Sequence, residues 1–139
     1  MKTLLIDDDP TVVFFIELLF QRAGLADALT VLQSPAQAVA YLQQQVQAGT
    51  PPEVVLLDLN MPLMSGWDVL DAIKPLEASL LGRCVVYVCT SSLAPYDAAR
   101  AQQYPLVERL LQKPLNQAGL QAIQERAAQH AQKRAASAG

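Results

Sequence analysis

Polar side chains that could bind a ligand or react lie where the apolar segments of this chain end. They are Asp7 and Asp8 after residues 2–6, Asp58 after residues 54–57, Thr90 after residues 84–89, and Lys113 after residues 107–112. If those segments are parallel strands, their carboxyl ends share one edge of the sheet, where open α/β sheets bind ligands. The spacing therefore predicts three carboxylates, one hydroxyl and one ammonium group in a single crevice.

The charge of such a crevice limits what it binds. Two carboxylates about 4 Å apart repel by roughly 4 kcal/mol at an effective dielectric of 20, and one lysine cannot neutralise three acids. A divalent cation would, and oxygen ligands without histidine or cysteine favour Mg²⁺, with Mn²⁺ possible. An acidic metal site facing a lysine and a hydroxyl suits a phosphoryl group, with Asp58 as a candidate nucleophile for an aspartyl-phosphate.

The segments between these positions have the pattern of helices. Apolar residues recur at helical spacing in each, so that strand and helix alternate along the chain. We expect strands at residues 2–6, 28–32, 54–57, 84–89 and 107–112, and helices at residues 10–24, 35–49, 67–75, 95–103 and 116–132. This alternation predicts a doubly wound α/β fold, with one parallel sheet covered by helices on both faces.

The first helix carries the clearest local signals. Asp9 is expected to cap it, because Pro10 follows at the first helical position and Gly24 suits the C-terminal stop. Its buried stripe is expected at Val12, Ile16, Leu19 and Ala23. Asp9 is therefore assigned to capping and not to the crevice.

Length and composition limit the class of protein. The 139 residues predict one domain, residues 1–133, followed by a frayed tail at residues 134–139 and no output domain. Lys and Arg total 10 against 13 Asp and Glu, without a basic run, which argues against direct nucleic-acid binding. The first residues lack the pattern of a secretion leader, so none is expected, and no apolar run approaches the ~20 residues that span a bilayer.

The two cysteines indicate a reducing compartment. Cys84 and Cys89 lie five positions apart in one apolar segment, which places them on opposite faces of a strand and too far apart to form a disulfide. The chain is therefore expected to be cytoplasmic.

Four motifs, LLIDDDP, VVLLDLNMPLMSGWDVL, VVYVCTSS and LLQKPL, together resemble the receiver domain of two-component response regulators. The resemblance covers essentially the whole chain and is that of a stand-alone receiver domain. It implies the flavodoxin-like sheet order 2-1-3-4-5. A receiver is a phosphoacceptor that assists its own phosphorylation and dephosphorylation, so the resemblance does not imply an enzyme with separate substrates.

The resemblance also assigns roles to the crevice residues. It makes Asp58 the phosphoacceptor and makes Asp7 and Asp8 the acidic pair that holds Mg²⁺, with Asp8 as the direct ligand. Asp58 itself and the backbone carbonyl of Asn60 complete the expected ligands. Thr90 would bond a phosphoryl oxygen, and Lys113 would pair with the phosphate.

The partners follow from the same resemblance. The phosphoryl donor would be a histidine kinase or a histidine phosphotransfer protein, and the output would be a protein target bound in trans. A cis bond is expected between Lys113 and Pro114. The family often has Tyr or Phe three positions before the lysine, as a rotor that follows the threonine inward, and Leu110 stands there in this chain.

Two other functions fit parts of the sequence. Asp7 and Asp9 could be the nucleophile and the acid/base of a haloacid-dehalogenase-like phosphatase, but that family needs an acidic pair after the lysine. Beyond Lys113 the only acid is Glu125. The chain could also be an interaction module that keeps the fold without being phosphorylated.

Overall fold

A five-stranded parallel sheet in the order β2-β1-β3-β4-β5 organises the computed structural model, which describes residues 1–138, and their side chains through residue 136. The strands are β1 (Thr3–Ile6), β2 (Leu29–Leu32), β3 (Val54–Asp58), β4 (Val85–Thr90) and β5 (Val107–Gln112). Every neighbouring pair is parallel. The predicted fold class and the order 2-1-3-4-5 are confirmed.

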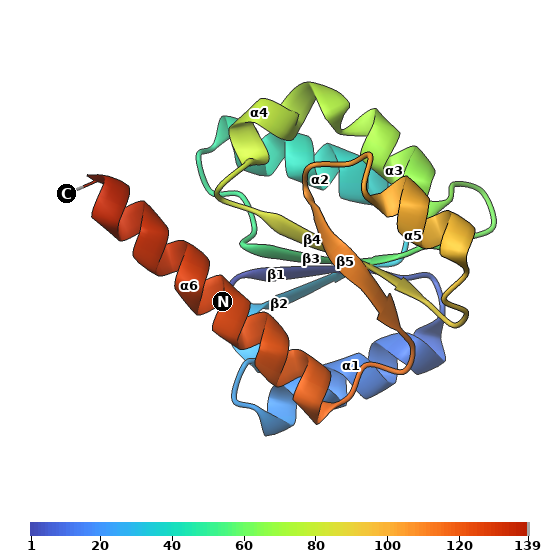
Figure 1. The fold of residues 1–139 in the computed structure, drawn as a ribbon. Coiled ribbons are helices and arrows are strands. Elements are labelled where there is room, and N and C mark those ends of the chain that lie inside the picture. The colour runs from blue at the N-terminus through green and yellow to red at the C-terminus, as the bar shows by residue number, and fades with distance from the viewer. Residues whose placement is uncertain (139) are drawn as a thin grey trace.

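Helices cover both faces of this sheet. They are α1 (Pro10–Arg22), α2 (Pro35–Gln47), α3 (Gly66–Ala72), α4 (Glu77–Leu80), α5 (Pro95–Ala101) and α6 (Gln117–Ala138). In Figure 1, α1 and α6 lie on one face and α2 to α5 on the other. Two separate apolar cores result, and every residue of β1, β3 and β4 is buried because both faces are covered.

The ends of α1 agree with the sequence signals. The Asp9 side chain accepts a hydrogen bond from the Thr11 backbone N–H at 2.9 Å, and Pro10 is the first helical residue. Gly24 follows the helix with φ +74°, a conformation that glycine adopts without steric cost. The cap and the stop predicted for this helix are therefore confirmed.

The predicted buried stripe of α1 is correct only at Ile16. The other buried residues lie one position after the predicted Val12 and Leu19. The helix buries Val13, Ile16 and Phe20, whereas Ala23 is exposed and lies beyond the last turn. Val12 and Leu19 are half-buried. The large Phe20 ring enters the core and fixes the rotation of the helix, which spacing alone did not show.

Pro75 divides the segment after β3 into short pieces. The α3 helix begins with a capping box, in which Ser65 and Asp68 bond each other's backbone N–H groups, and it ends at Ala72. A 3₁₀ turn, Lys74–Leu76, and the short α4 follow. The predicted helix at residues 67–75 is therefore too long at its C-terminal end, and α4 was not predicted.

The last helix is longer than predicted. Asn116 caps it as expected, since its Oδ1 accepts the Gly119 N–H at 2.8 Å. Arg134 near the far end lies 3.7 Å from the Glu53 carboxylate and donates to the Gly82 carbonyl at 3.3 Å. The structure continues the helix through residues 134–138, and residue 139 lies outside the described residues; the frayed tail at residues 134–139 stays a prediction.

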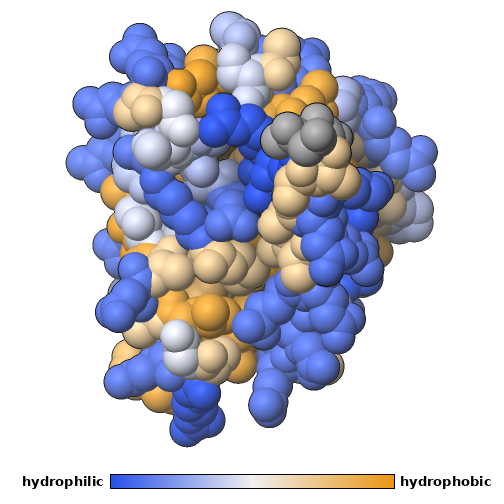
Figure 2. Space-filling view, turned by 90° about the vertical axis from the view of Figure 1, so that its left-hand side faces the viewer, coloured by the Kyte–Doolittle hydropathy of each residue, from blue (hydrophilic) through white to orange (hydrophobic). Residues whose placement is uncertain are grey.

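The C-terminal part of α6 extends past the edge of the sheet in Figure 1. Figure 2 views the molecule from that side, where hydrophilic side chains predominate around a smaller apolar patch in the lower half. Within residues 1–138, no helix combines the length and the apolar character needed to cross a membrane. Cys84 and Cys89 are free thiols in opposite cores, as predicted.

Candidate functional site

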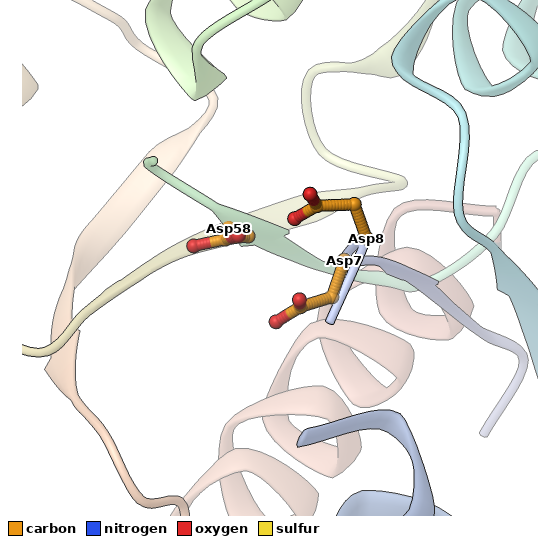
Figure 3. Close-up of side chains that lie close together, drawn as sticks. All are labelled: Asp7, Asp8 and Asp58. Carbon is orange, nitrogen blue, oxygen red and sulfur yellow. The ribbon is translucent and has the colours of Figure 1, made fainter. Parts of the chain in front are cut away.

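Three carboxylates meet at the carboxyl edge of the sheet. Strand β1 ends at Ile6, so Asp7 and Asp8 emerge beside Asp58, the last residue of the neighbouring strand β3 (Figure 3). One oxygen from each of the three carboxylates lies within 4.8 Å of the others. Asp7 and Asp58 are only 1% and 4% exposed, whereas Asp8 is half-buried.

Lys113 reaches this cluster from the loop after β5. Its Nζ lies 3.0 Å from Asp7 Oδ2 and 2.9 Å from Asp58 Oδ1. Its backbone N–H donates to the Thr90 carbonyl at 2.8 Å, and the bond to Pro114 is cis, as expected. The lysine therefore bridges two buried acids but neutralises only one of the three negative charges, and Asp8 takes no part in its ion pairs.

Backbone N–H groups orient the two buried carboxylates. Asp7 Oδ1 accepts the Asp9 N–H at 2.9 Å, and Asp58 Oδ1 accepts the Asn60 N–H at 3.2 Å. Sequence reasoning proposed the Asn60 carbonyl as a ligand but missed its N–H as a donor to Asp58. The Asp58 Oδ1 atom thus carries two donors, and no hydrogen bond to Oδ2 is found within the described part of the chain.

Gly66 limits the loop that follows Asp58. A Cβ atom at this position would lie 2.8 Å from the Asp58 carbonyl oxygen and 3.1 Å from Leu59 Cα, so the backbone would have to move. The Gly66 N–H also donates to the Leu59 carbonyl at 2.9 Å. The start of α3 is therefore packed directly against the backbone of Asp58.

Burial and charge shift the pKa values of this cluster. Burial raises the pKa of Asp58, and the negative charge of Asp7 adds to this, while the bond from Lys113 opposes it. Burial also disfavours the charge on Lys113, but the hydrogen bonds and charges of Asp58 and Asp7 outweigh that penalty and raise its pKa. The ammonium and the acids therefore form a mutually dependent group with a net negative charge.

Thr90 contacts Lys113 through its backbone carbonyl, but its hydroxyl makes no hydrogen bond to the three carboxylates or to the Lys113 ammonium. Its hydroxyl donates to the Ser92 carbonyl at 3.1 Å and accepts the Ser92 N–H at 3.2 Å. Residue 89, directly before it, pairs with Asp58 across β3 and β4. Among the residues predicted for the site, the structure thus gathers Asp7, Asp8, Asp58 and Lys113 and turns the Thr90 hydroxyl toward its own loop.

An open cleft of about 720 Å³ gives solvent access to this cluster. Asp8, Asp58, Asn60, Ser91 and Lys113 all line it. Asp9 also lines the cleft, and its Oδ1 is engaged in capping α1.

The donor set suits a hard divalent cation. Three carboxylates supply oxygen ligands, which Mg²⁺ and Mn²⁺ prefer. The nearest thiol, Cys89, is buried, and burial raises its pKa to about 12, so it stays protonated and is a poor ligand. The residues present therefore fit Mg²⁺.

Comparison with known proteins agrees with this site. The family model described as "Response regulator receiver domain" matches residues 3–125. The chain is 32% identical over 114 residues to the probable methanogenesis regulatory protein FilR2 of Methanothrix harundinacea, covering 81% of this chain and 72% of FilR2.

Solved structures show the same fold. A two-component response regulator from Cytophaga hutchinsonii has a TM-score of 0.80 at 27% identity, over 91% of this chain and 96% of that one. The receiver domain of the Arabidopsis thaliana histidine kinase CKI1, solved with Mg²⁺ and BeF₃⁻, has a TM-score of 0.72 at 21% identity, over 88% and 87% of the two chains. The fold and the acidic edge define a signalling receiver module. The chain belongs to the response regulator receiver domain family of two-component systems.

Proposed function

We propose that Asp58 accepts a phosphoryl group in a Mg²⁺-dependent reaction and that the phosphorylated domain switches a surface that binds a protein partner. The observation that carries this proposal is the buried Asp58 carboxylate, which is 2.9 Å from the Lys113 ammonium and opens onto a solvent-accessible acidic cleft. A buried carboxylate with a positioned cation and room for an incoming group is the arrangement that in-line phosphoryl transfer needs.

The two oxygens of Asp58 have different tasks in this reaction. Oδ1 is held by Lys113 and the Asn60 N–H, so Oδ2 is the oxygen available to attack phosphorus. The new bond joins Oδ2 to phosphorus while the phosphorus–nitrogen bond of a phosphohistidine breaks, and its electron pair leaves with the imidazole nitrogen. The product is an acyl phosphate on Asp58.

Asp7, Asp8 and Asp58, with the Asn60 carbonyl, would hold the metal. When bound, Mg²⁺ supplies charge neutralisation for the crowded carboxylates and for the transferred oxygens. When Asp58 becomes an acyl phosphate, its carboxyl group no longer carries a negative charge. The ammonium of Lys113 would then pair with the phosphoryl oxygens instead. Thr90 would exchange its bonds with Ser92 for a bond to a phosphoryl oxygen, which moves the loop after β4.

The donor protein is proposed to be a histidine kinase or a histidine phosphotransfer protein in the cytoplasm. Phe14 and Phe15 on α1 are 61% and 59% exposed, and Phe15 lines a small apolar cavity that Asp58 and Lys113 also border. Exposed aromatic side chains beside a reactive group are typical anchors for a partner. The partner that receives the signal is proposed to be another protein bound in trans, and no separate substrate is turned over.

Intact-mass measurement with acetyl phosphate tests the proposal. The wild-type chain should gain one phosphoryl unit with Mg²⁺ and none in EDTA, and Asp58→Asn should gain none. Asp7→Asn, which removes a neighbouring acid and not the nucleophile, should keep the site but react more slowly.

Two results would contradict the proposal. Label that survives Asp58→Asn and disappears in Asp7→Asn would favour the phosphatase chemistry of Asp7 and Asp9. No Mg²⁺-dependent labelling of a folded wild-type chain, from acetyl phosphate or from a phosphorylated histidine phosphotransfer domain, would favour an interaction module.

A further inference from the structure

A cluster of aromatic and charged side chains joins the helix after the Asp58 loop to the helix after the Thr90 loop. Trp67 on α3 and Tyr104 after α5 stack with ring centroids 5.5 Å apart and an interplanar angle of 16°. Both side chains are buried, at 5% and 7% exposure. We call Trp67, Asp71, Lys74, Arg100 and Tyr104 the aromatic bridge.

A cation from each helical segment lies over the aromatic ring of the other segment. Arg100 of α5 lies with its Cζ 5.2 Å from the Trp67 ring centre, and Lys74 lies with its Nζ 5.7 Å from the Tyr104 ring centre. The Tyr104 hydroxyl also donates to Asp71 Oδ1 at 2.8 Å. Trp67 and Asp71 are one helical turn apart and hold Tyr104 from the same face of α3.

We propose that this aromatic bridge is the route by which phosphorylation of Asp58 repositions α5, with Tyr104 as the positioning residue. The inference rests on the proposed function. At one end, Trp67 directly follows Gly66, which is packed against the Asp58 backbone, so a shift of the Asp58 loop moves Trp67. At the other end, Tyr104 and Arg100 are attached to α5.

The α5 helix has few other anchors that would fix its position. It has seven residues, its N-cap Ala94 makes no side-chain hydrogen bond, and Ala101 is its only buried residue. Helices this short are not stable by themselves and take their position from tertiary contacts. Besides its packing against β5, α5 is therefore linked to α3 by Arg100 over the Trp67 ring and, just beyond its C-terminal end, by the stack of Tyr104 on Trp67.

Leu110 gives the bridge its importance in this chain. It is a half-buried aliphatic residue of β5 that can neither stack nor form a hydrogen bond through its side chain. The aromatic group available to link the two loops is instead Tyr104, six residues earlier, and it contacts α3 and not the Thr90 hydroxyl, which bonds Ser92. The signal to α5 thus runs from β3 through α3.

The test measures α5 directly while the site is loaded with Mg²⁺ and BeF₃⁻, a phosphoryl analogue. Amide NMR spectra are recorded for wild type, Tyr104→Leu and Tyr96→Leu, without and with the analogue. Tyr96 is the matched control because it lies on α5, is 71% exposed and, although it lies near Arg100, takes no part in the stack of Trp67 and Tyr104. Amides of residues 58–60 report binding at the site, and amides of residues 98–101 report α5.

The expected result is a shift of the site amides in all three proteins and a shift of the α5 amides in wild type and Tyr96→Leu only. Tyr104→Phe, which keeps the stack and loses the bond to Asp71, should retain a reduced α5 shift. If Tyr104→Leu does not fold, Arg100→Gln replaces it, because Arg100 is only half-buried and its loss should likewise reduce the α5 shift. The fluorescence of Trp67, the only tryptophan in the sequence, provides a second readout.

Unchanged α5 shifts in a folded Tyr104→Leu or Arg100→Gln protein, with the site amides still responding, would overturn the aromatic bridge alone. If the amides of residues 58–60 do not shift with the analogue in any of the proteins, phosphoryl binding at Asp58 is refuted. The inference about the aromatic bridge is then refuted as well. A folded Tyr96→Leu protein that loses the α5 response as fully as Tyr104→Leu would also overturn the specific role of Tyr104.

Discussion

The excess negative charge of Asp8 should destabilise the chain without metal and stabilise it with metal. Asp8 has a carboxylate oxygen within 4.8 Å of those of Asp7 and Asp58, and Lys113 pairs with the other two acids and not with Asp8. Asp8→Asn therefore removes repulsion and leaves both ion pairs of Lys113 in place.

The size of the effect follows from the separation. At 4.8 Å, one pair of like charges costs about 3.5 kcal/mol at an effective dielectric of 20 and about 0.9 kcal/mol in water. Asp8 is half-buried and Lys113 offsets part of the repulsion, so we expect Asp8→Asn to raise the free energy of unfolding by about 1–2 kcal/mol in EDTA. For a chain of this length that corresponds to about 3–7 °C in Tm.

Magnesium should reverse the order of stability. A metal at 100 times its dissociation constant stabilises the folded state by about 2.7 kcal/mol, and Asp8→Asn removes one of its ligands. Thermal and urea unfolding in EDTA and in saturating Mg²⁺ measure both halves of the prediction. Asp9→Asn is the matched control, because asparagine caps a helix as well as aspartate and Asp9 lies outside the cluster of three. An Asp8→Asn protein less stable than wild type in EDTA, or equally stabilised by Mg²⁺, would refute the reasoning.

Two further predictions concern other parts of the chain. Gly66→Ala should destabilise the protein by about 1–3 kcal/mol and slow phosphorylation, because its Cβ would meet the Asp58 carbonyl at 2.8 Å. Gly119→Ala should be tolerated better, because its Cβ would meet side-chain atoms and no backbone, namely Leu115 Cδ1 at 2.9 Å and Asn116 Oδ1 at 3.4 Å. Urea unfolding and acetyl-phosphate labelling compare the two, and equal losses would contradict the packing argument. Burial, and then the Arg126 charge, lower the pKa of His130, whose buried Nε2 has no hydrogen-bond partner among the described residues. Its neutral form is thus favoured in the folded state, so wild type should lose stability relative to His130→Gln as the pH falls from above 6.5 through the lowered pKa; parallel pH profiles of unfolding for the two proteins would contradict this.

The sheet was predictable because its central strands are covered on both faces. Their uninterrupted apolar runs end at polar residues, and the strand predicted at residues 54–57 agrees with the central β3 (Val54–Asp58) to within one residue. The parallel order then brings Asp7, Asp8 and Asp58 to one edge without any knowledge of their contacts. The gathering of the site is a consequence of topology, which the alternation of strands and helices predicts.

Features that depend on tertiary contacts were not predictable. The rotation of α1 depends on Phe20 entering the core, and the length of α6 depends on Arg134 reaching Glu53 and Gly82 across the fold. The resting position of the Thr90 hydroxyl depends on its loop, since it bonds Ser92 and not the site. Local sequence patterns do not contain these long-range partners.

Chemical location of the phosphoryl group tests the central claim most directly. After Mg²⁺-dependent labelling, borohydride reduces an acyl phosphate to an alcohol and marks the acceptor as homoserine, which peptide mass mapping locates. The account predicts this mark at position 58 alone and at no position in the EDTA control. A mark at position 7 or 9, or a stable phosphate that borohydride does not reduce, would contradict it.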